Sequence, residues 1–216
     1  LWPWVALACR HDLSMDRLAQ LARVSVAELR DPGRRFSQVI ANRVAELAYQ
    51  TVGGGAGMEA ALLVEAGHFA LLELLARTSP NVREAIALIS QFFPLIHDDV
   101  NLPHEKRPDG AHHLRFVSPS SYVVHHGYVE LMFAVLMLAL RRETAQPAIE
   151  AVEVWFEHRA PVDRRAFETV FGPRVRFDMP ENHMLFDAKV AALPLARKNS
   201  DVHAAAVRAA SDLLRG

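Results

Sequence analysis

The sequence has little cysteine, no surplus of charge and no long apolar run, and each shortage excludes a class of protein. The single cysteine, Cys9, rules out a disulfide framework within the chain, which is typical of a reducing compartment. The formal net charge is −1, whereas a domain that binds DNA through its phosphates usually has a clear basic surplus. We therefore expect that this chain does not bind nucleic acid by itself.

Membrane and secretion signals are also missing. The longest uninterrupted apolar run is Leu131–Leu140, which is too short for the roughly 20 residues that a bilayer span needs. Glu130 and Arg141 flank this run, so the pattern predicts a buried core helix. The opening residues, "LWPWVALACRHD", contain no charged leader before an apolar segment with a cleavage site. We expect them to be the interior of a longer, cytoplasmic chain.

The composition is that of a globular protein. The chain has 216 residues, of which 51% are hydrophobic and 23% are charged, so it is long enough to bury a core. Helical signals dominate the first half. Ser14 and Ser25 are expected to cap two short helices, and apolar residues at helical spacing predict a longer helix from Asn81 through Phe93.

Strand signals enter in the second half. The stretch "HDDVNLPHEKRPDGAHHLRFVSP" has two short extended runs around a Pro-Asp-Gly turn, which indicates a hairpin. An apolar helix over Val123–Arg142 follows, and alternation in "VEVWFEHRAP", "RVRFD" and "HMLFD" predicts further strands. The sequence thus predicts an α+β fold, rich in helix, with a small mixed or antiparallel sheet formed mainly in the second half. We expect one domain over residues 1–216: a helical part over 1–95, a mixed α/β part over 96–200, and a terminal linker helix over 201–216.

Two segments resemble nucleotide- or DNA-binding motifs, but each lacks a part that the motif requires. "GGGAG", Gly53 to Gly57, follows a predicted helix and precedes Met58-Glu59, whereas a phosphate loop follows a strand and ends in Gly-Lys-Ser/Thr. We interpret it as a loop between helices. "LSMDRLAQLARVSVAEL", Leu13 to Leu29, looks like a helix-turn-helix, but Asp31-Pro32 cuts its second helix short. We interpret it as a packed helical hairpin.

The chain has 11 histidines, some in adjacent pairs, His112-His113 and His125-His126. Adjacent strand residues face opposite sides, so the first pair cannot easily share one ion. A zinc site needs three or four converging ligands, and no spacing here is diagnostic. Further donors in this region are His97, Asp98, Asp99 and His104. We expect structural or surface histidines, no metal and no cofactor. No nucleophile motif is present, so we expect no catalytic residues.

The sequence allows more than one role for each of two residues, Glu130 and His158. Glu130 begins the most apolar helix, with Ala134 and Met137 at helical spacing from it. It is either an exposed acid favoured by the helix dipole, or a buried polar anchor beside an apolar cavity, partnered by an arginine or histidine. His158 follows Val154 and Phe156 at strand spacing, which favours a half-buried imidazole bonded to a neighbour over a catalytic one.

Several motifs, in order, resemble one family. "VEVWFEHRAP" resembles the Val-x-Phe-x-His-x-x-Pro segment of bacterial AraC/XylS-type transcriptional regulators, and "FGPRVRFDMPENHMLFD" is similar to their Phe-Gly…Val-x-Phe…Asn-x-Leu-x-Phe segment, with Met184 in the usual leucine place. "ALPLARKNSD", "DPGRRF" and "SPNVREAI" are similar to the family's Leu-Pro-Leu, Asp-Pro and Ser-Pro-Thr-x-x-Glu-Ala elements, with Asn81 replacing the threonine. Glu130 stands where the family's central helix commonly carries a glutamate.

The resemblance implies the N-terminal, arabinose-binding-like regulatory domain of such a regulator. Its partners would be a small-molecule effector and a second copy of the chain, with no membrane partner. DNA would be reached only through a C-terminal helix-turn-helix domain that is absent from this chain. The apolar residue types suggest a partly hydrophobic effector with one polar end. The expected ligand-binding residues are Glu130, Phe133, Met137, Phe156, His158 and Phe177. The alternative is a stand-alone α+β enzyme or metal- or ligand-binding protein that uses His158 or the histidine pairs.

Overall fold

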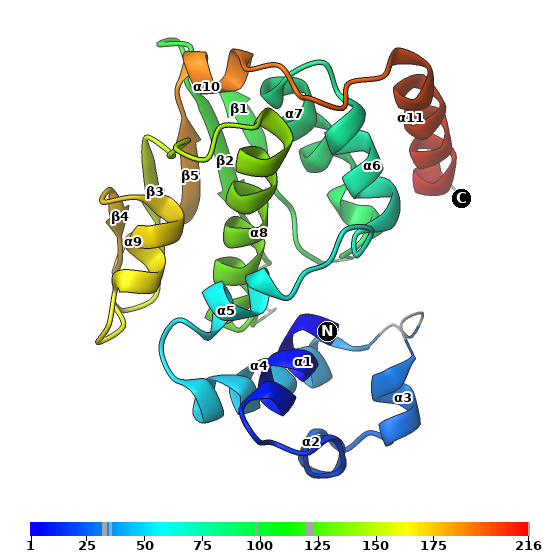
Figure 1. The fold of residues 1–216 in the computed structure, drawn as a ribbon, viewed down its shortest axis with the longest axis vertical. Helices are drawn as coiled ribbons and strands as arrows, with labels where there is room; N and C mark the ends of the chain where they lie inside the picture. Colours follow the sequence, from blue (N-terminus) through cyan, green and yellow to red (C-terminus); the bar gives the residue numbers. More distant parts are fainter. Residues whose placement is uncertain (32–33, 35, 98, 120–122, 216) are drawn as a thin grey trace. The chain divides into compact units, whose positions relative to one another are not determined.

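The computed structural model describes residues 1–31, 34, 36–97, 99–119 and 123–215 (Figure 1). These residues form two compact units, each assembled from separated segments. The first unit comprises residues 1–64, 124–135 and 161–167, and the second comprises 65–123, 136–160 and 168–216. Among the described residues, no helix has the length and apolar character to cross a membrane.

Helices make up the first unit. They are α1 (Trp2–Arg10), α2 (Met15–Ala22), α3 (Val26–Arg30), α4 (Gln38–Val52), α5 (Ala56–Leu62) and the first part of α8 (His126–Thr144). α1 packs against α2, α4 and α5. The buried side chains of this unit include Trp4, Leu7, Leu18, Val44, Met58 and Phe133.

Capping side chains begin the short helices where the sequence predicts. The Ser14 hydroxyl oxygen accepts the backbone N–H of Arg17. Ser25 forms a capping box with Glu28: its hydroxyl accepts the N–H of Glu28, whose carboxylate accepts the N–H of Ser25. Because α3 has only 5 residues, the segment over 13–29 is two short packed helices, as expected. Pro32 and Gly33, expected to end α3, lie outside the described residues.

Two predicted boundaries in the first unit are wrong. The loop expected over Gly53–Gly57 ends earlier, because α5 begins at Ala56 and includes Gly57. The central apolar helix α8 begins at His126 instead of Val123 and extends to Thr144. The first shift puts Gly57 inside a helix, at a point where α5 approaches α8 closely. The spacing of apolar residues carries no information about such an approach.

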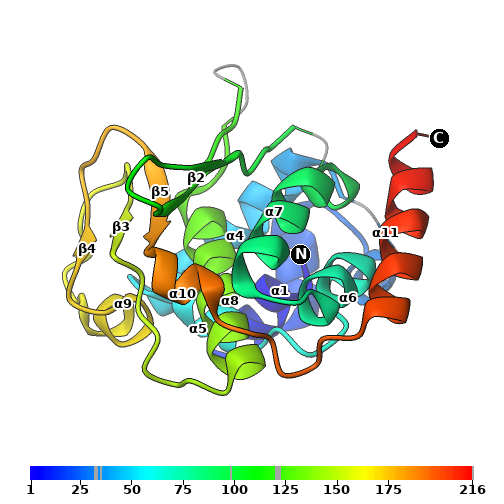
Figure 2. The ribbon, with the colours of Figure 1, turned by 90° about the horizontal axis from the view of Figure 1, so that it is seen from above.

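The second unit combines helices with a sheet. α6 (Ala70–Thr78), α7 (Val82–Phe92), the 3-10 turn η1 (Phe93–Leu95), α10 (Ala188–Ala192) and α11 (Ser200–Arg215) join the later part of α8 and most of α9 (Arg165–Phe171). The Asn81 side chain accepts the N–H of Glu84 at 3.0 Å, which confirms the predicted start of α7. α6 packs against both α7 and α11, as both ribbon views show (Figures 1 and 2).

The sheet has five strands in the order β1-β2-β5-β3-β4. They are β1 (His104–Lys106), β2 (His112–Phe116), β3 (Glu153–Trp155), β4 (Val175–Arg176) and β5 (Asn182–Phe186). β1–β2, β2–β5 and β5–β3 are antiparallel, while β3 and β4 are parallel. The prediction of an α+β fold with a small mixed sheet in the second half is therefore confirmed.

Register places different chemistry on the two faces of the sheet. Leu114, Met184 and Val154 are paired across β2, β5 and β3 and are buried on one face. The other face carries two aligned rows, one of His113, Leu185 and Glu153 and one of Arg115, His183 and Trp155. β3 ends at Trp155, earlier than the alternation through His158 suggests, because the Glu157 N–H leaves the ladder to bond the Asn182 side chain at 3.0 Å.

Candidate functional site

A buried acid is the central feature of the first unit. Glu130 lies in α8 with 1% of its surface exposed. The phenol of Tyr49, in α4, donates a hydrogen bond to Glu130 Oε2, and the backbone N–H of Gly57, in α5, also bonds the carboxyl group. Glu130 is buried, as the second of the two readings from the sequence expects, but this partner is a tyrosine and not the expected arginine or histidine.

Burial changes the protonation of Glu130. Removal from water disfavours the carboxylate and raises its pKa from 4.5 to about 8, against the smaller lowering by the hydrogen bonds of Tyr49 and Gly57. At neutral pH the group is therefore mainly protonated. The pKa of the Tyr49 phenol is raised as well, by its own burial and then by the neighbouring acid. Two adjacent groups thus act as neutral hydrogen-bonding groups inside an otherwise apolar helical core.

Two glycines allow the helices to approach at this point. A Cβ atom at Gly57 would lie 2.5 Å from both the Cβ and Oε2 atoms of Glu130. A Cβ atom at Gly127 would lie 3.0 Å from the Trp4 ring and would overlap the ring of Tyr49. A side chain at either position would overlap neighbours that cannot move away without opening the core. Each glycine is therefore required for the close approach of the helices.

Histidines surround Tyr49. The rings of His125 and His126 lie 4.9 and 4.8 Å from the Tyr49 ring, measured between centroids. His125 Nδ1 accepts the N–H of Gly127 at 3.1 Å, so its Nε2–H is the group that faces Glu46 Oε2 at 3.0 Å. Burial lowers the pKa of His125, and Glu46 partly offsets that effect. This pair of histidines therefore supports the tyrosine instead of offering two metal ligands.

The expected ligand-binding residues are divided between the units. Glu130 and Phe133 belong to the first unit, and both are buried. Met137, Phe156, His158 and Phe177 belong to the second. Within the second unit, the His158 ring is half-buried, lies 5.1 Å from the Phe156 ring and 5.4 Å from the Phe177 ring, and its Nδ1 bonds the Arg159 carbonyl at 2.9 Å. His158 is thus the half-buried, hydrogen-bonded imidazole that its strand spacing indicates.

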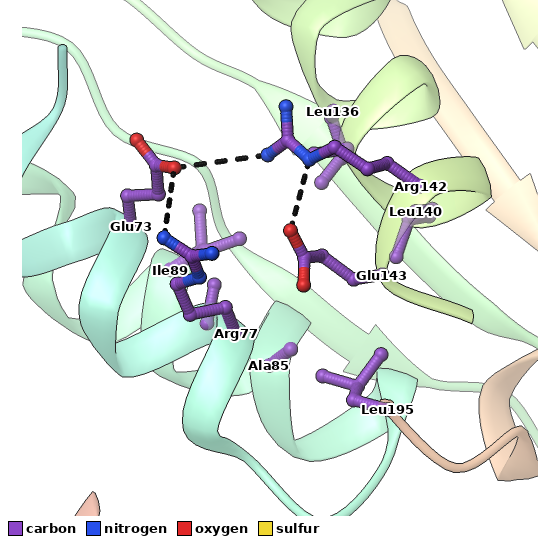
Figure 3. Close-up of a pocket in the computed structure, with 11 residues that line it drawn as sticks. Glu73, Arg77, Ala85, Ile89, Leu136, Leu140, Arg142, Glu143 and Leu195 are labelled. Carbon is purple, nitrogen blue, oxygen red and sulfur yellow. Dashed lines mark hydrogen bonds and ion pairs between the residues drawn. The ribbon is translucent and has the colours of Figure 1, made fainter. Parts of the chain in front are cut away.

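The second unit contains a small cavity of about 40 Å³ (Figure 3). Its walls are Ala85, Ile89, Leu136, Leu140 and Leu195, and charged side chains close one side. Arg142 lies between two acids there: its Nε is 2.9 Å from Glu143 Oε1, and its Nη2 is 3.7 Å from Glu73 Oε1. A volume of this size holds a water molecule or two, far below the roughly 300 Å³ of an ordinary ligand pocket. In this conformation the cavity is too small to hold an effector of that size.

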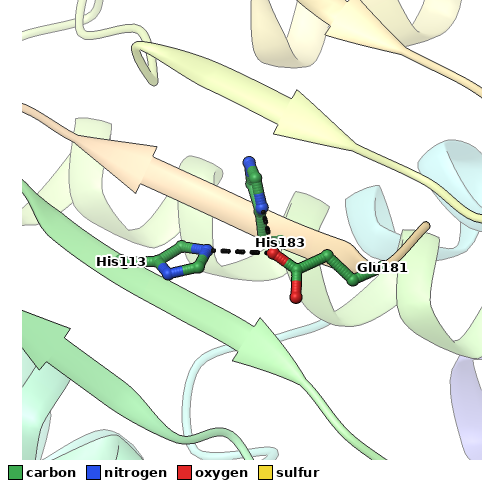
Figure 4. Close-up of side chains that lie close together, drawn as sticks. All are labelled: His113, Glu181 and His183. Carbon is green, nitrogen blue, oxygen red and sulfur yellow. Dashed lines mark hydrogen bonds and ion pairs between the residues drawn. The ribbon is translucent and has the colours of Figure 1, made fainter. Parts of the chain in front are cut away.

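His112 and His113 point to opposite faces of the sheet, as the alternation of side chains along β2 predicts. His112 faces His104, with their ring nitrogens 2.8 Å apart, whereas His113 lies on the other face near Glu181 and His183. Among the described residues, His113, Glu181 and His183 form the one group of three possible metal ligands (Figure 4). His113 is a candidate ligand from the sequence, whereas Glu181 and His183 are not, because the register that joins β2 to β5 cannot be read from the spacing of residues. Asp98, also considered as a ligand, lies outside the described residues.

Comparison with known proteins gives a family and a fold. Residues 13–195 match the family model described as the arabinose-binding domain of AraC transcription regulator, N-terminal. Comparison with curated proteins gives no match. Among solved structures, the crystal structure of the transcriptional regulator CdpR from Pseudomonas aeruginosa is similar, with a TM-score of 0.64 and 14% sequence identity. The match covers 97% of this chain and 65% of that one, so this chain spans less than two thirds of the regulator's length.

Proposed function

Because the chain belongs to the family of N-terminal arabinose-binding domains of AraC transcription regulators, we propose that it senses a small effector and forms dimers, and that it thereby controls an attached DNA-binding domain. The observation that carries the effector-sensing part is the buried Glu130–Tyr49 pair. The near-zero charge of this chain agrees with DNA contact through another part of the protein.

A buried acid with a strongly raised pKa costs folding free energy, and such groups concentrate at functional sites. Glu130 is held by α4 through Tyr49 and by α5 through Gly57. A ligand that bonded its carboxyl group would therefore act on three helices of the first unit at once. That position would let a small molecule change the packing of helices, which the exposed acids elsewhere in the unit could not do.

The protonation of Glu130 indicates the chemistry of the effector. A protonated carboxyl group can donate a hydrogen bond, so it would bind an acceptor such as a carboxylate or carbonyl oxygen. Phe133, one turn further along the same helix, and Trp4, whose ring lies 6.0 Å from that of Tyr49, are apolar and buried. We infer a partly hydrophobic molecule with one polar, acceptor-bearing end. The family description names arabinose, but the apolar side chains of Phe133 and Trp4 near this pair favour a less polar molecule than a sugar.

Control of DNA binding would follow from thermodynamic linkage. An effector shifts the balance between two arrangements only if it binds one of them more tightly, and the shift cannot exceed that difference in affinity. We propose that the effector changes the monomer–dimer equilibrium or the position of the attached DNA-binding domain. Sedimentation velocity of this chain with and without the effector distinguishes these two routes, because only the first changes the dissociation constant of the dimer.

A thermal-shift screen tests the proposed function. Fatty acids, amino acids and aromatic acids are added separately to the purified chain, and the melting temperature is followed. A ligand that binds the native state at 100 times its dissociation constant raises the unfolding free energy by about 2.7 kcal/mol. We expect one class of apolar acid to raise the melting temperature in a concentration-dependent way. If no class does so, effector sensing is wrong and a ligand-free dimerisation role remains.

A further inference from the structure

Three possible metal ligands meet on one face of the sheet in the second unit (Figure 4). His113 comes from β2 and His183 from β5. The register pairs His113 with Leu185 and Arg115 with His183, so the two histidines are diagonal neighbours on the same face. Glu181 stands just before β5 and reaches both rings. The ligands thus come from adjacent strands whose register is fixed by the hydrogen bonds of the sheet.

The distances suit a small divalent cation. Glu181 Oε1 lies 2.9 Å from His183 Nδ1 and 3.4 Å from His113 Nε2, and the ligand atoms all lie within 4.8 Å of one another. Tetrahedral zinc with ligand atoms at 2.0–2.1 Å separates those atoms by about 3.4 Å. Only small side-chain movements are needed to place an ion between the three atoms.

The two histidines of this group are largely shielded from water, which favours a bound ion over hydration of the ligand atoms. The side chains of His183 and His113 are 4% and 15% exposed. His113 Nε2 is buried and makes no hydrogen bond with the described residues, which costs free energy unless another group satisfies it.

The surroundings of His183 resemble the outer shell of a metal site. Glu153 Oε1 lies 3.5 Å from Nε2 of His183, the nitrogen on the opposite side of the ring from Glu181. Glu153 is itself held by the Trp155 indole N–H at 3.2 Å, and the Trp155 ring stacks on His183 with centroids 4.3 Å apart. In this state His183 Nε2 makes no hydrogen bond with the described residues, and Nδ1 bonds Glu181. With Nδ1 on a metal, Nε2 would carry the proton and Glu153 would accept it, as carboxylates do in the outer shell of metal sites.

We propose that His113 Nε2, His183 Nδ1 and a Glu181 oxygen bind one divalent transition-metal ion, for which zinc is the best match. Two imidazoles and one carboxylate are a set that zinc accepts, and three protein ligands leave at least one position open to water or an anionic molecule. The site goes beyond the proposed function, because effector binding at Glu130 and control of DNA binding require no metal. It differs from the expectation of no metal, which rested on the adjacent histidine pairs.

Nearby charge does not prevent cation binding. Arg115 lies on the same face as His183, and its guanidinium pairs with Glu105 at 2.9 Å. The carboxylates of Glu181 and Glu153 contribute negative charge next to the two histidines. The other close histidine pair of the sheet, His104–His112, lies on the opposite face. Substitution of His104 is therefore a matched control with the same change of residue type.

Metal titration of the whole chain tests the site. The protein is treated with a chelator and dialysed, and Zn²⁺ is titrated by calorimetry; Co²⁺ absorption then reports the ligand set. We expect one ion per chain. His183→Ala and Glu181→Gln should weaken binding by at least about 100-fold, and Glu153→Gln by about 10–100-fold, as for outer-shell groups. His104→Ala and Glu130→Gln should bind like the unaltered chain.

Three results would overturn the proposal. They are a folded, chelator-treated protein that binds no stoichiometric Zn²⁺, equal Zn²⁺ affinity in His183→Ala and the unaltered chain, and loss of Zn²⁺ binding in His104→Ala alone. Circular dichroism and the melting temperature of each metal-free variant check folding. If His183→Ala does not fold, Glu181→Gln decides, because Glu181 is 37% exposed and its replacement should leave the fold intact.

Discussion

Tyr49 donates a hydrogen bond to Glu130 across two helices of the first unit, and both groups are withdrawn from water. The bond links a phenol to a carboxyl group whose pKa is raised to about 8. A helix-rich unit stabilised by apolar packing has no structural need for this acid, which is why we place the proposed effector contact there.

Replacing Glu130 by glutamine should change the pH dependence of stability. The pKa of Glu130 rises from 4.5 to about 8 on folding, so between these pH values the folded chain holds a proton that the unfolded chain has released. This acid therefore makes the unfolding free energy fall by about 1.4 kcal/mol per pH unit as pH rises through that window. Glu130→Gln should remove that contribution and gain stability relative to the unaltered chain from pH 5 to pH 8.

Urea denaturation at four pH values measures the difference. Other groups titrate in the same window, so the comparison is between the two proteins at each pH rather than along one curve. Parallel dependence on pH in the two proteins would contradict the raised pKa.

Tyr49→Phe should destabilise the first unit. The variant keeps the ring beside Trp4 and His125 but removes the O–H that Glu130 accepts, leaving a buried polar group with one partner fewer. We expect a loss of about 1–2 kcal/mol and a further rise in the pKa of Glu130, because the bond lowers it. Combining this change with Glu130→Leu, which removes the acceptor, gives a double-mutant cycle; strictly additive changes in the free energy of unfolding would mean that the two groups do not interact.

Gly57→Ala should destabilise the chain even though alanine is the better helix former. Alanine in place of glycine inside a helix usually gains about 0.5–1 kcal/mol. Here the new methyl group would lie 2.5 Å from atoms of Glu130, and relieving that overlap should cost about 1–3 kcal/mol. Leu62→Ala, at an exposed position of the same helix, is the control. A stabilised Gly57→Ala variant would show that α5 and α8 are not in close contact.

Local patterns predicted the elements better than the contacts between them. Ser14, Ser25 and Asn81 mark helix starts because a capping side chain bonds backbone two or three residues away. The alternation in β2 correctly put His112 and His113 on opposite faces. These are short-range effects, and the sequence contains all of the groups involved.

The contacts of the candidate sites are long-range and were missed for that reason. The apolar surroundings of Glu130 indicated burial, but nothing nearby in sequence identifies Tyr49, which is 81 residues away. His113 and His183 meet only because β2 pairs with β5 in one register; a shift by one residue would put them on opposite faces. Gly57 looked like part of a loop because its role is to leave room for another helix.

Calorimetric titration at pH 7 with the acid that gives the largest thermal shift tests whether the effector is recognised through Glu130. The unaltered chain, Glu130→Leu, which has no donor at this place, and Leu62→Ala are compared at the same concentration. We expect saturable binding to the unaltered chain and to Leu62→Ala, with affinity reduced about tenfold or more in Glu130→Leu, as for loss of one hydrogen bond to a charged group. Equal affinity in all three proteins would contradict the claim that the effector is recognised through Glu130.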